Sequence, residues 1–221
     1  MALLHVDNHD LAAYDGGYVG CRNGVIADMD LGKLADVQMG YPFRSRLEHD
    51  PQGNVAVIQM KDIDDANLVH TDEAIKVTLP RGKEHHLLRA GDLLFRSRGR
   101  SNGAALVSGD VGTAVLSAPL LLIRPHGVLP DYLCWFINTP ATQAQLAALS
   151  EGTSVRMISA EALKALDIPL PSQATQQRIV QAAALAERER SLMVQIAAQR
   201  QRLTTHILMQ HAHHIPKKAH P

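Results

Sequence analysis

Residues 130–203 read PDYLCWFINTPATQAQLAALSEGTSVRMISAEALKALDIPLPSQATQQRIVQAAALAERERSLMVQIAAQRQRL, and they carry the clearest pattern in the chain. Two amphipathic segments flank a Gly-Thr-Ser-Val-Arg turn at 152–156, and a Pro-Leu-Pro breaker follows at 169–171. Glycine and proline are then absent from Ala174 to about Gln210. We expect a single helix there, which would be roughly 55 Å long at about 1.5 Å per residue.

Apolar side chains recur along this predicted helix with the alternating four-three spacing of a coiled-coil seam, which Glu189 and Gln199 interrupt. A helix of this length cannot be covered by a domain as small as this one. We therefore predict an intermolecular seam; the alternative is one amphipathic helix that lies on its own domain. The seam ends at His206, and the predicted interface residues are Leu185, Leu192, Ile196 and Leu203 in the seam and Ile207 beside it.

Upstream of Pro130 the pattern changes to short apolar runs between turn residues, which is typical of strands. We expect a mixed α/β (α+β) domain with a curved, mostly antiparallel sheet and short helices, followed by the long coiled-coil-forming helix. Thr139 and Ser159 are expected to cap short helices, and Ser172 or Thr175 the long one. The expected strands are 55–60, 75–79, 93–95, 104–107, 114–116 and 120–124.

These patterns divide the chain into four parts. Met29 begins a fresh pattern after a weakly patterned start, so the residues leave open whether translation begins at Met1 or Met29. The expected parts are a poorly specified extension at 1–28, a domain at 29–171, the long helix at 172–211 and a flexible His-rich tail at 212–221.

The composition is that of a globular protein, with 46% hydrophobic and 20% charged residues among 221. The 22 basic and 22 acidic residues give a net charge of zero, whereas a protein that binds DNA tightly by itself is usually basic. Aromatic residues are only 4%, which is poor for stacking unpaired bases. A nucleic-acid function would therefore need segregated charge or a partner that supplies most phosphate contacts.

The two cysteines, Cys21 and Cys134, are too far apart in sequence to indicate a disulfide framework. Cys134 lies in an apolar run, which predicts a buried, unreactive thiol. The N-terminal residues lack the basic and apolar regions of a signal peptide, and no run of 18 apolar residues is present. We expect a cytoplasmic protein without membrane contact.

Arginines alternate with small polar residues in two places, Arg44-Ser45-Arg46 and Arg96-Ser97-Arg98-Gly99-Arg100. The arginine side chain presents a planar fork that matches phosphate and the guanine O6/N7 edge. The 152–156 turn adds hydroxyl groups and an arginine near a helix start. The alternative is a set of solvated loops. The predicted DNA-binding residues are Arg44, Arg46, Arg96, Ser97, Arg98, Arg100, Asn102, Thr153, Ser154 and Arg156.

Motifs for catalysis or a closed metal site are absent from the sequence. His85-His86 and the C-terminal histidines lack the accompanying ligand spacing of a zinc site. No Walker loop, GxGxxG, HExxH or Asn-Pro-Pro-aromatic tetrapeptide occurs. We expect no catalytic residue, no bound metal and no cofactor in this chain.

Five segments in this order resemble the specificity subunit of type I restriction-modification systems: 91–96, 119–124, 130–139, 152–158, and 168–171 with 176–179. The resemblance covers roughly residues 31–208. It implies a target-recognition domain with a long helix and a non-catalytic, sequence-specific role in DNA recognition. The usual subunit carries two such domains and two helices. This chain has one of each and looks like a half-subunit.

The resemblance also implies partners. They are double-stranded DNA, a second copy of this chain paired through antiparallel helices, methyltransferase subunits that bring S-adenosylmethionine, and a motor-nuclease subunit. A two-fold dimer would read an interrupted palindrome. A competing interpretation is a structural adaptor that binds partners through its helix without reading DNA. A weaker one is a metal-dependent hydrolase built on the histidines.

Overall fold

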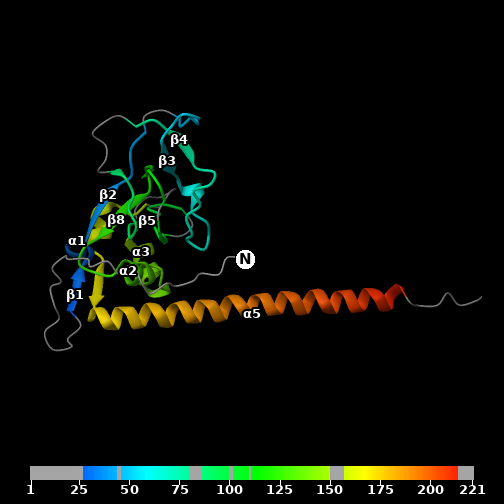
Figure 1. Ribbon diagram of the computed structural model, residues 1–221. Helices are drawn as coiled ribbons and strands as arrows, with labels where there is room; N and C mark the ends of the chain where they lie inside the picture. The colour runs from blue at the N-terminus through cyan, green and yellow to red at the C-terminus, as the bar shows by residue number, and fades with distance from the viewer. Residues whose placement is uncertain are drawn as a thin grey trace, which may run out of the picture. The chain divides into compact units, whose positions relative to one another are not determined.

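The computed structural model describes residues 27–43, 46–79, 86–99, 102–109, 111–149 and 157–213 (Figure 1). The chain divides into two compact units, residues 1–177 and 178–221. The first unit holds all the described strands and the short helices, and the second holds most of the long helix. No helix in the described ranges is long and apolar enough to cross a membrane.

The largest sheet has four antiparallel strands in the order β2-β8-β5-β6. Leu93 of β5 lies opposite Ile123 of β8 on one side and opposite Leu106 of β6 on the other. All three residues of β5 are buried, because the strand is central and both of its faces are covered. The strands are β2 (Ala35–Met39), β5 (Leu93–Phe95), β6 (Ala104–Leu106) and β8 (Leu121–Pro125).

A second sheet has three strands in the order β4-β3-β7, and β3 pairs with β7 in parallel. Its strands are β3 (Val55–Ile58), β4 (Ile75–Val77) and β7 (Ala114–Leu116), and η1 (Met60–Asp62) follows β3. The mixed α/β class with mostly antiparallel pairing is confirmed, but the described strands form three separate sheets rather than one. Short apolar runs carry no signal for which strands will pair.

The hydrophobic core lies between these two sheets. Ile58 and Leu116 of the three-stranded sheet pack in one cluster with Leu94 and Leu122 of the four-stranded sheet, and each is at most 2% exposed. Full burial of a side chain of this size stabilises the fold by about 1.5–3 kcal/mol. This shared core fixes the two sheets relative to each other and therefore positions the loops at their ends.

The third sheet joins the start and the end of the domain. Strand β1 (Ala27–Asp30) pairs antiparallel with β9 (Asp167–Leu170), and α1 (Leu31–Leu34) follows β1 directly. Ala27 lies opposite Leu170, so β1 begins two residues before the expected domain start at 29. The expected 1–28 extension otherwise lies outside the described residues.

The three short helices are α2 (Pro130–Ile137), α3 (Pro140–Leu149) and α4 (Ala160–Lys164), and the last two begin directly after the predicted caps Thr139 and Ser159. Thr139 Oγ1 accepts the N–H of Thr142 at 3.4 Å, and Ser159 Oγ accepts the N–H of Ala162 at 3.1 Å. Both predicted caps are confirmed. A cap of this kind satisfies one of the unpaired N–H groups of the first turn and contributes about 1 kcal/mol.

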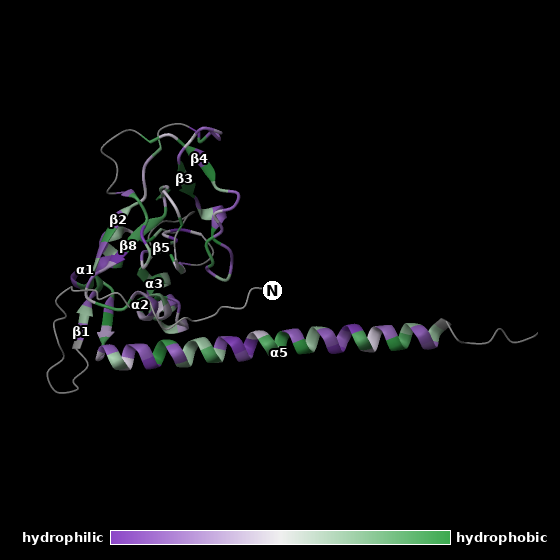
Figure 2. Cartoon of the chain, viewed as in Figure 1, coloured by the Kyte–Doolittle hydropathy of each residue, from purple (hydrophilic) through white to green (hydrophobic). Residues whose placement is uncertain are grey.

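The long helix α5 spans Gln173–His213, against the expected range 172–211. Ser172 caps it, because its Oγ accepts the Thr175 N–H at 3.3 Å. Apolar and polar residues alternate along α5 (Figure 2). The large apolar side chains of residues 185–209 are exposed, with Leu185 at 72% and Leu203 at 60%.

Candidate nucleic-acid interface

The predicted arginine loop connects β5 and β6 and is closed at its base. The Arg96 N–H donates to the Gly103 carbonyl at 3.0 Å, and the Asn102 side chain donates to the Arg96 carbonyl at 3.0 Å. Asn138, which directly follows α2, holds Ala104, the residue after Gly103. The Asn138 side-chain amide accepts the Ala104 N–H and donates to the Ala104 carbonyl. The ends of the loop are therefore fixed by both sheet and helix.

Arg96 and Ser97 point inward rather than to the surface. Arg96 is 8% exposed, and its guanidinium donates to the carbonyls of Ile63 and Asp64. Ser97 is 1% exposed, and its hydroxyl donates to the Pro119 carbonyl at 2.5 Å. The sequence predicts DNA contacts for both residues. Their burial and their intramolecular partners instead favour a structural role, because a buried polar group without its partner is costly.

Arg98 is exposed, and its backbone forms an isolated antiparallel β-bridge with that of Met157. Next to this bridge the Ile158 N–H donates to the Ser97 carbonyl at 2.7 Å. Met157 directly follows the 152–156 turn, so the structure brings the residue after this turn against the arginine loop. The turn's own residues Thr153, Ser154 and Arg156 lie outside the described residues, as do Arg44 and Arg100.

Arg46 is exposed and lines a cavity of about 540 Å³ together with Gln59 and Ser117. Gln59 precedes Met60, and the Met60 methyl group lies 3.5 Å from the position that a Cβ on Gly99 would occupy. Gly99 has φ +125°, a conformation that favours glycine. Helix η1 is therefore close to both features. Gln59, directly before it, lines the cavity with Arg46, and Met60 at its start approaches Gly99 of the arginine loop.

The turn Asp64–His70 lies against the arginine loop. Asp64 Oδ1 accepts the N–H groups of Ala66 and Leu68, and its Oδ2 lies 3.0 Å from His70 Nε2. The hydrogen bond from His70 is the main cause that lowers the pKa of Asp64. A Cβ on Gly103 would collide with the Asn67 amide, which shows how closely turn and loop pack.

The Cys134 thiol is not arranged as a nucleophile, and the described residues form no metal centre. Burial raises the pKa of the Cys134 thiol to about 11, and the thiol donates to the Ala104 carbonyl at 3.5 Å. A thiol with so high a pKa is almost entirely protonated at neutral pH and a poor nucleophile. No group of three His, Cys, Asp or Glu side chains within the described ranges is arranged to hold a metal ion.

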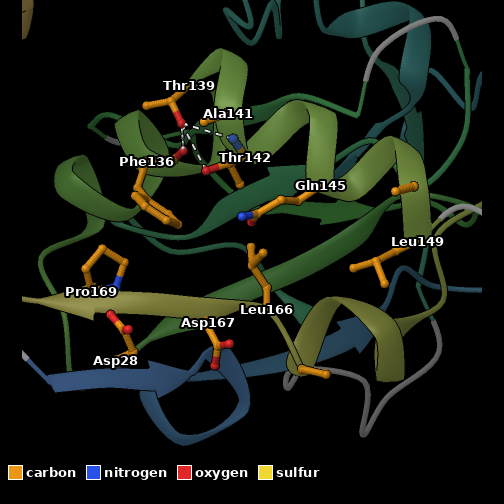
Figure 3. A pocket seen from close by; sticks show the side chains of 12 residues that line it. Asp28, Phe136, Thr139, Ala141, Thr142, Gln145, Leu149, Leu166, Asp167 and Pro169 are labelled. Atoms are coloured by element: carbon orange, nitrogen blue, oxygen red, sulfur yellow. Dashed lines mark hydrogen bonds between the residues drawn. The ribbon is translucent and has the colours of Figure 1, made fainter.

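A cavity of about 660 Å³ is of a different kind (Figure 3). Phe136, Leu149 and Leu166 contribute apolar walls, and Asp28 and Asp167 come from the paired strands β1 and β9. No lysine or arginine of the described residues lines it. Two carboxylates without a cation repel phosphate, so this cavity is a poor candidate for binding the DNA backbone.

Comparison with known proteins places these features in a family context. The family model described as the type I restriction modification DNA specificity domain matches residues 26–183. The type I restriction enzyme HindI specificity subunit of Haemophilus influenzae is 25% identical over 140 residues, which are 61% of this chain and 30% of that protein.

Solved structures show the same fold. The HsdS subunit from Thermoanaerobacter tengcongensis matches 77% of the chain and 39% of its own length, with a TM-score of 0.57 and 18% identity. A chain from a study of complex assembly and conformational transition of the type I R-M system matches 85% of this chain and 44% of its own length, with a TM-score of 0.67 and 18% identity. This chain spans less than half the length of each relative.

Proposed function

The chain belongs to the family of type I restriction modification DNA specificity domains, and from that premise we propose that it is a non-catalytic, sequence-specific DNA-recognition subunit of a type I restriction-modification complex. The observation that carries the proposal is the family match over residues 26–183, which includes both the arginine loop and the 152–156 turn. The bridge between Arg98 and Met157 supports it, because it brings Arg98 against the residue that directly follows the 152–156 turn.

In this proposal the DNA-facing residues are Arg46, Arg98, Asn102 and the predicted residues around them. Arg98 and Arg46 are exposed, so their guanidinium groups are available for phosphate or for a guanine edge. The proposed contacts from the surrounding segments are Arg44, Arg100, Thr153, Ser154 and Arg156. Arg96 and Ser97 instead stabilise the arginine loop, because their side chains donate to the carbonyls of Ile63 and Pro119.

Charge is segregated along the chain. Residues 1–172 hold 15 Lys and Arg against 20 Asp and Glu, whereas residues 173–221 hold 7 against 2. An acidic domain is repelled by duplex DNA at long range, so base reading by this domain needs partners that contribute phosphate contacts. We propose that methyltransferase subunits, which bind S-adenosylmethionine, are those partners, and that a motor-nuclease subunit joins them in the cytoplasm.

The exposed apolar face of α5 supports self-association as part of the same function. Leu185, Leu192 and Ile196 are 72%, 42% and 52% exposed, and they recur at seam spacing. Two copies joined through this face would present two identical recognition domains related by a two-fold axis. The proposed target is therefore an interrupted palindrome with two identical half-sites.

A structural adaptor without DNA reading is the second candidate, and the acidic balance of residues 1–172 favours it. Co-expression with the methyltransferase subunits separates the two functions. We expect the chain to co-purify with them and the complex to retain one sequence from a pool of randomised duplexes. A complex that assembles but retains all duplexes equally would instead identify an adaptor. A chain that does not co-purify with a methyltransferase contradicts both.

A further inference from the structure

The two polar residues that interrupt the α5 seam, Glu189 and Gln199, carry information about how two copies pair. Both are exposed, and Gln199 lines a surface groove on α5 with Leu192, Ile196 and Leu203. A polar residue at a core position of a coiled coil weakens the pair, but it can also specify register and orientation. The question is which arrangement of two identical helices leaves these side chains with suitable partners.

A parallel pair of helices would place like charges opposite each other inside the seam. In a parallel, in-register homodimer each seam residue meets its own counterpart, so Glu189 would face Glu189 of the second copy inside the seam. Two carboxylates enclosed together repel each other, and each has given up part of its hydration. The seam positions of this chain therefore disfavour parallel pairing.

An antiparallel pair has one register in which Glu189 and Gln199 face each other. Core layers of an antiparallel coiled coil join an a position of one helix to a d position of the other. When Leu192 is placed opposite Ile196 of the second copy, Leu185 falls opposite Leu203 and Glu189 opposite Gln199. Apolar residues then meet apolar residues, and the Glu189 carboxylate can accept a hydrogen bond from the Gln199 amide of the second copy. The layers are Leu185–Leu203, Glu189–Gln199 and Leu192–Ile196, each occurring twice.

Registers shifted by one heptad do not have this match. Moving the second copy by seven residues in one direction places Leu192 opposite Leu203 but Ile196 opposite Gln199. Moving it in the other direction places Leu192 opposite Glu189. Either shift buries a polar group against a leucine or an isoleucine, where it has no hydrogen-bond partner.

We propose that Glu189 and Gln199 select the register of the α5 pair and that its two-fold axis lies between Leu192 and Ile196; the antiparallel orientation itself is what the family resemblance implies. The proposal rests on the self-association proposed above and specifies its geometry. The register also places Arg188 opposite Arg202 of the second copy at the flank of the seam. This like-charge contact is unfavourable and provides an independent test.

Paired cysteines test the register directly in the full-length chain with Cys21→Ser and Cys134→Ala as background. The double variant Leu185→Cys/Leu203→Cys should form a disulfide-linked dimer under mild oxidation, and either single variant should not. The matched control is Leu185→Cys/Ile196→Cys, in which the partners are offset by one heptad, or about 10 Å. A disulfide requires Cα atoms within about 7 Å, so this control should remain unlinked.

Charge reversal gives a second readout that needs no cysteine. Arg188→Glu should tighten the dimer about fivefold, because two like-charge contacts become opposite-charge contacts. In a parallel pair the same change would face Met193 and leave the dimer unaffected. A dimer that cross-links in the control variant, or one that does not tighten with Arg188→Glu, overturns the register. A monomer by light scattering at all concentrations overturns the proposed self-association as well.

Discussion

Arg96 and Arg98 lie two positions apart in one loop and have opposite environments. Arg98 is exposed, whereas Arg96 is 8% exposed and bonded to the Ile63 and Asp64 carbonyls. Arg98→Ala should weaken binding of the complex to all duplexes and reduce its salt slope by about one unit for each phosphate that the variant no longer neutralises. A matched control is Lys33→Ala, which removes an exposed cation from α1 and should leave the slope unchanged. A parental salt slope in Arg98→Ala removes this residue from the DNA face.

Arg96→Ala should act on stability instead. Removal of the guanidinium leaves the Ile63 and Asp64 carbonyls without that donor, which costs about 1–3 kcal/mol. Urea unfolding should therefore show a lower midpoint for Arg96→Ala, and the salt slope of the folded complex should stay parental. An unchanged unfolding midpoint would contradict the structural role of Arg96.

Asp64 gives a pH prediction. Its pKa in the folded protein is lowered from the usual value of 3.8, chiefly by the hydrogen bond from His70. A carboxyl group with a lowered folded pKa contributes stability above its unfolded pKa, and this contribution is lost as pH falls through the folded pKa. Asp64→Asn keeps the acceptor for Ala66 and Leu68 but cannot titrate. Below about pH 4 the wild-type Tm should fall more steeply than that of Asp64→Asn, and parallel Tm curves would contradict this assignment.

At the scale of elements, helices are more predictable from the sequence than sheets. The caps Thr139 and Ser159 are local, because a cap and the N–H group it accepts lie three residues apart. The parallel pairing of β3 with β7 depends instead on a contact between residues 56 and 114 that no local pattern encodes. The burial of Arg96 is likewise not predictable from a local pattern, because its hydrogen-bond partners lie more than 30 residues earlier in the chain.

The long helix allows a test at the same scale. Leu192→Glu with Ile196→Glu should produce a folded monomer, because a charge buried at the centre of a seam is costly. The matched control is Val194→Glu with Leu208→Glu, which alters residues that are also exposed but lie off the predicted seam. Light scattering should give a halved mass for the first variant alone. Equal masses for the two variants would place the contact elsewhere on α5.

At the scale of the whole molecule, we propose that two copies of the chain read DNA as a two-fold symmetric dimer. One recognition domain in each of two copies meets the same half-site twice and in inverted orientation. A protein with two different recognition domains would read two different half-sites. The form of the recognised sequence therefore reports on the number of distinct domains in the complex, whatever its base composition.

Methylome sequencing of cells that express this chain with its methyltransferase subunits tests whether the chain directs methylation as a two-fold dimer. A two-fold dimer of this chain should direct methylation to one interrupted palindrome, two identical half-sites separated by a fixed gap, and this methylation should disappear when the chain is deleted. Methylation at an asymmetric bipartite sequence would contradict the two-fold dimer. A methylation pattern that is identical with and without the chain would contradict the DNA-recognition function itself.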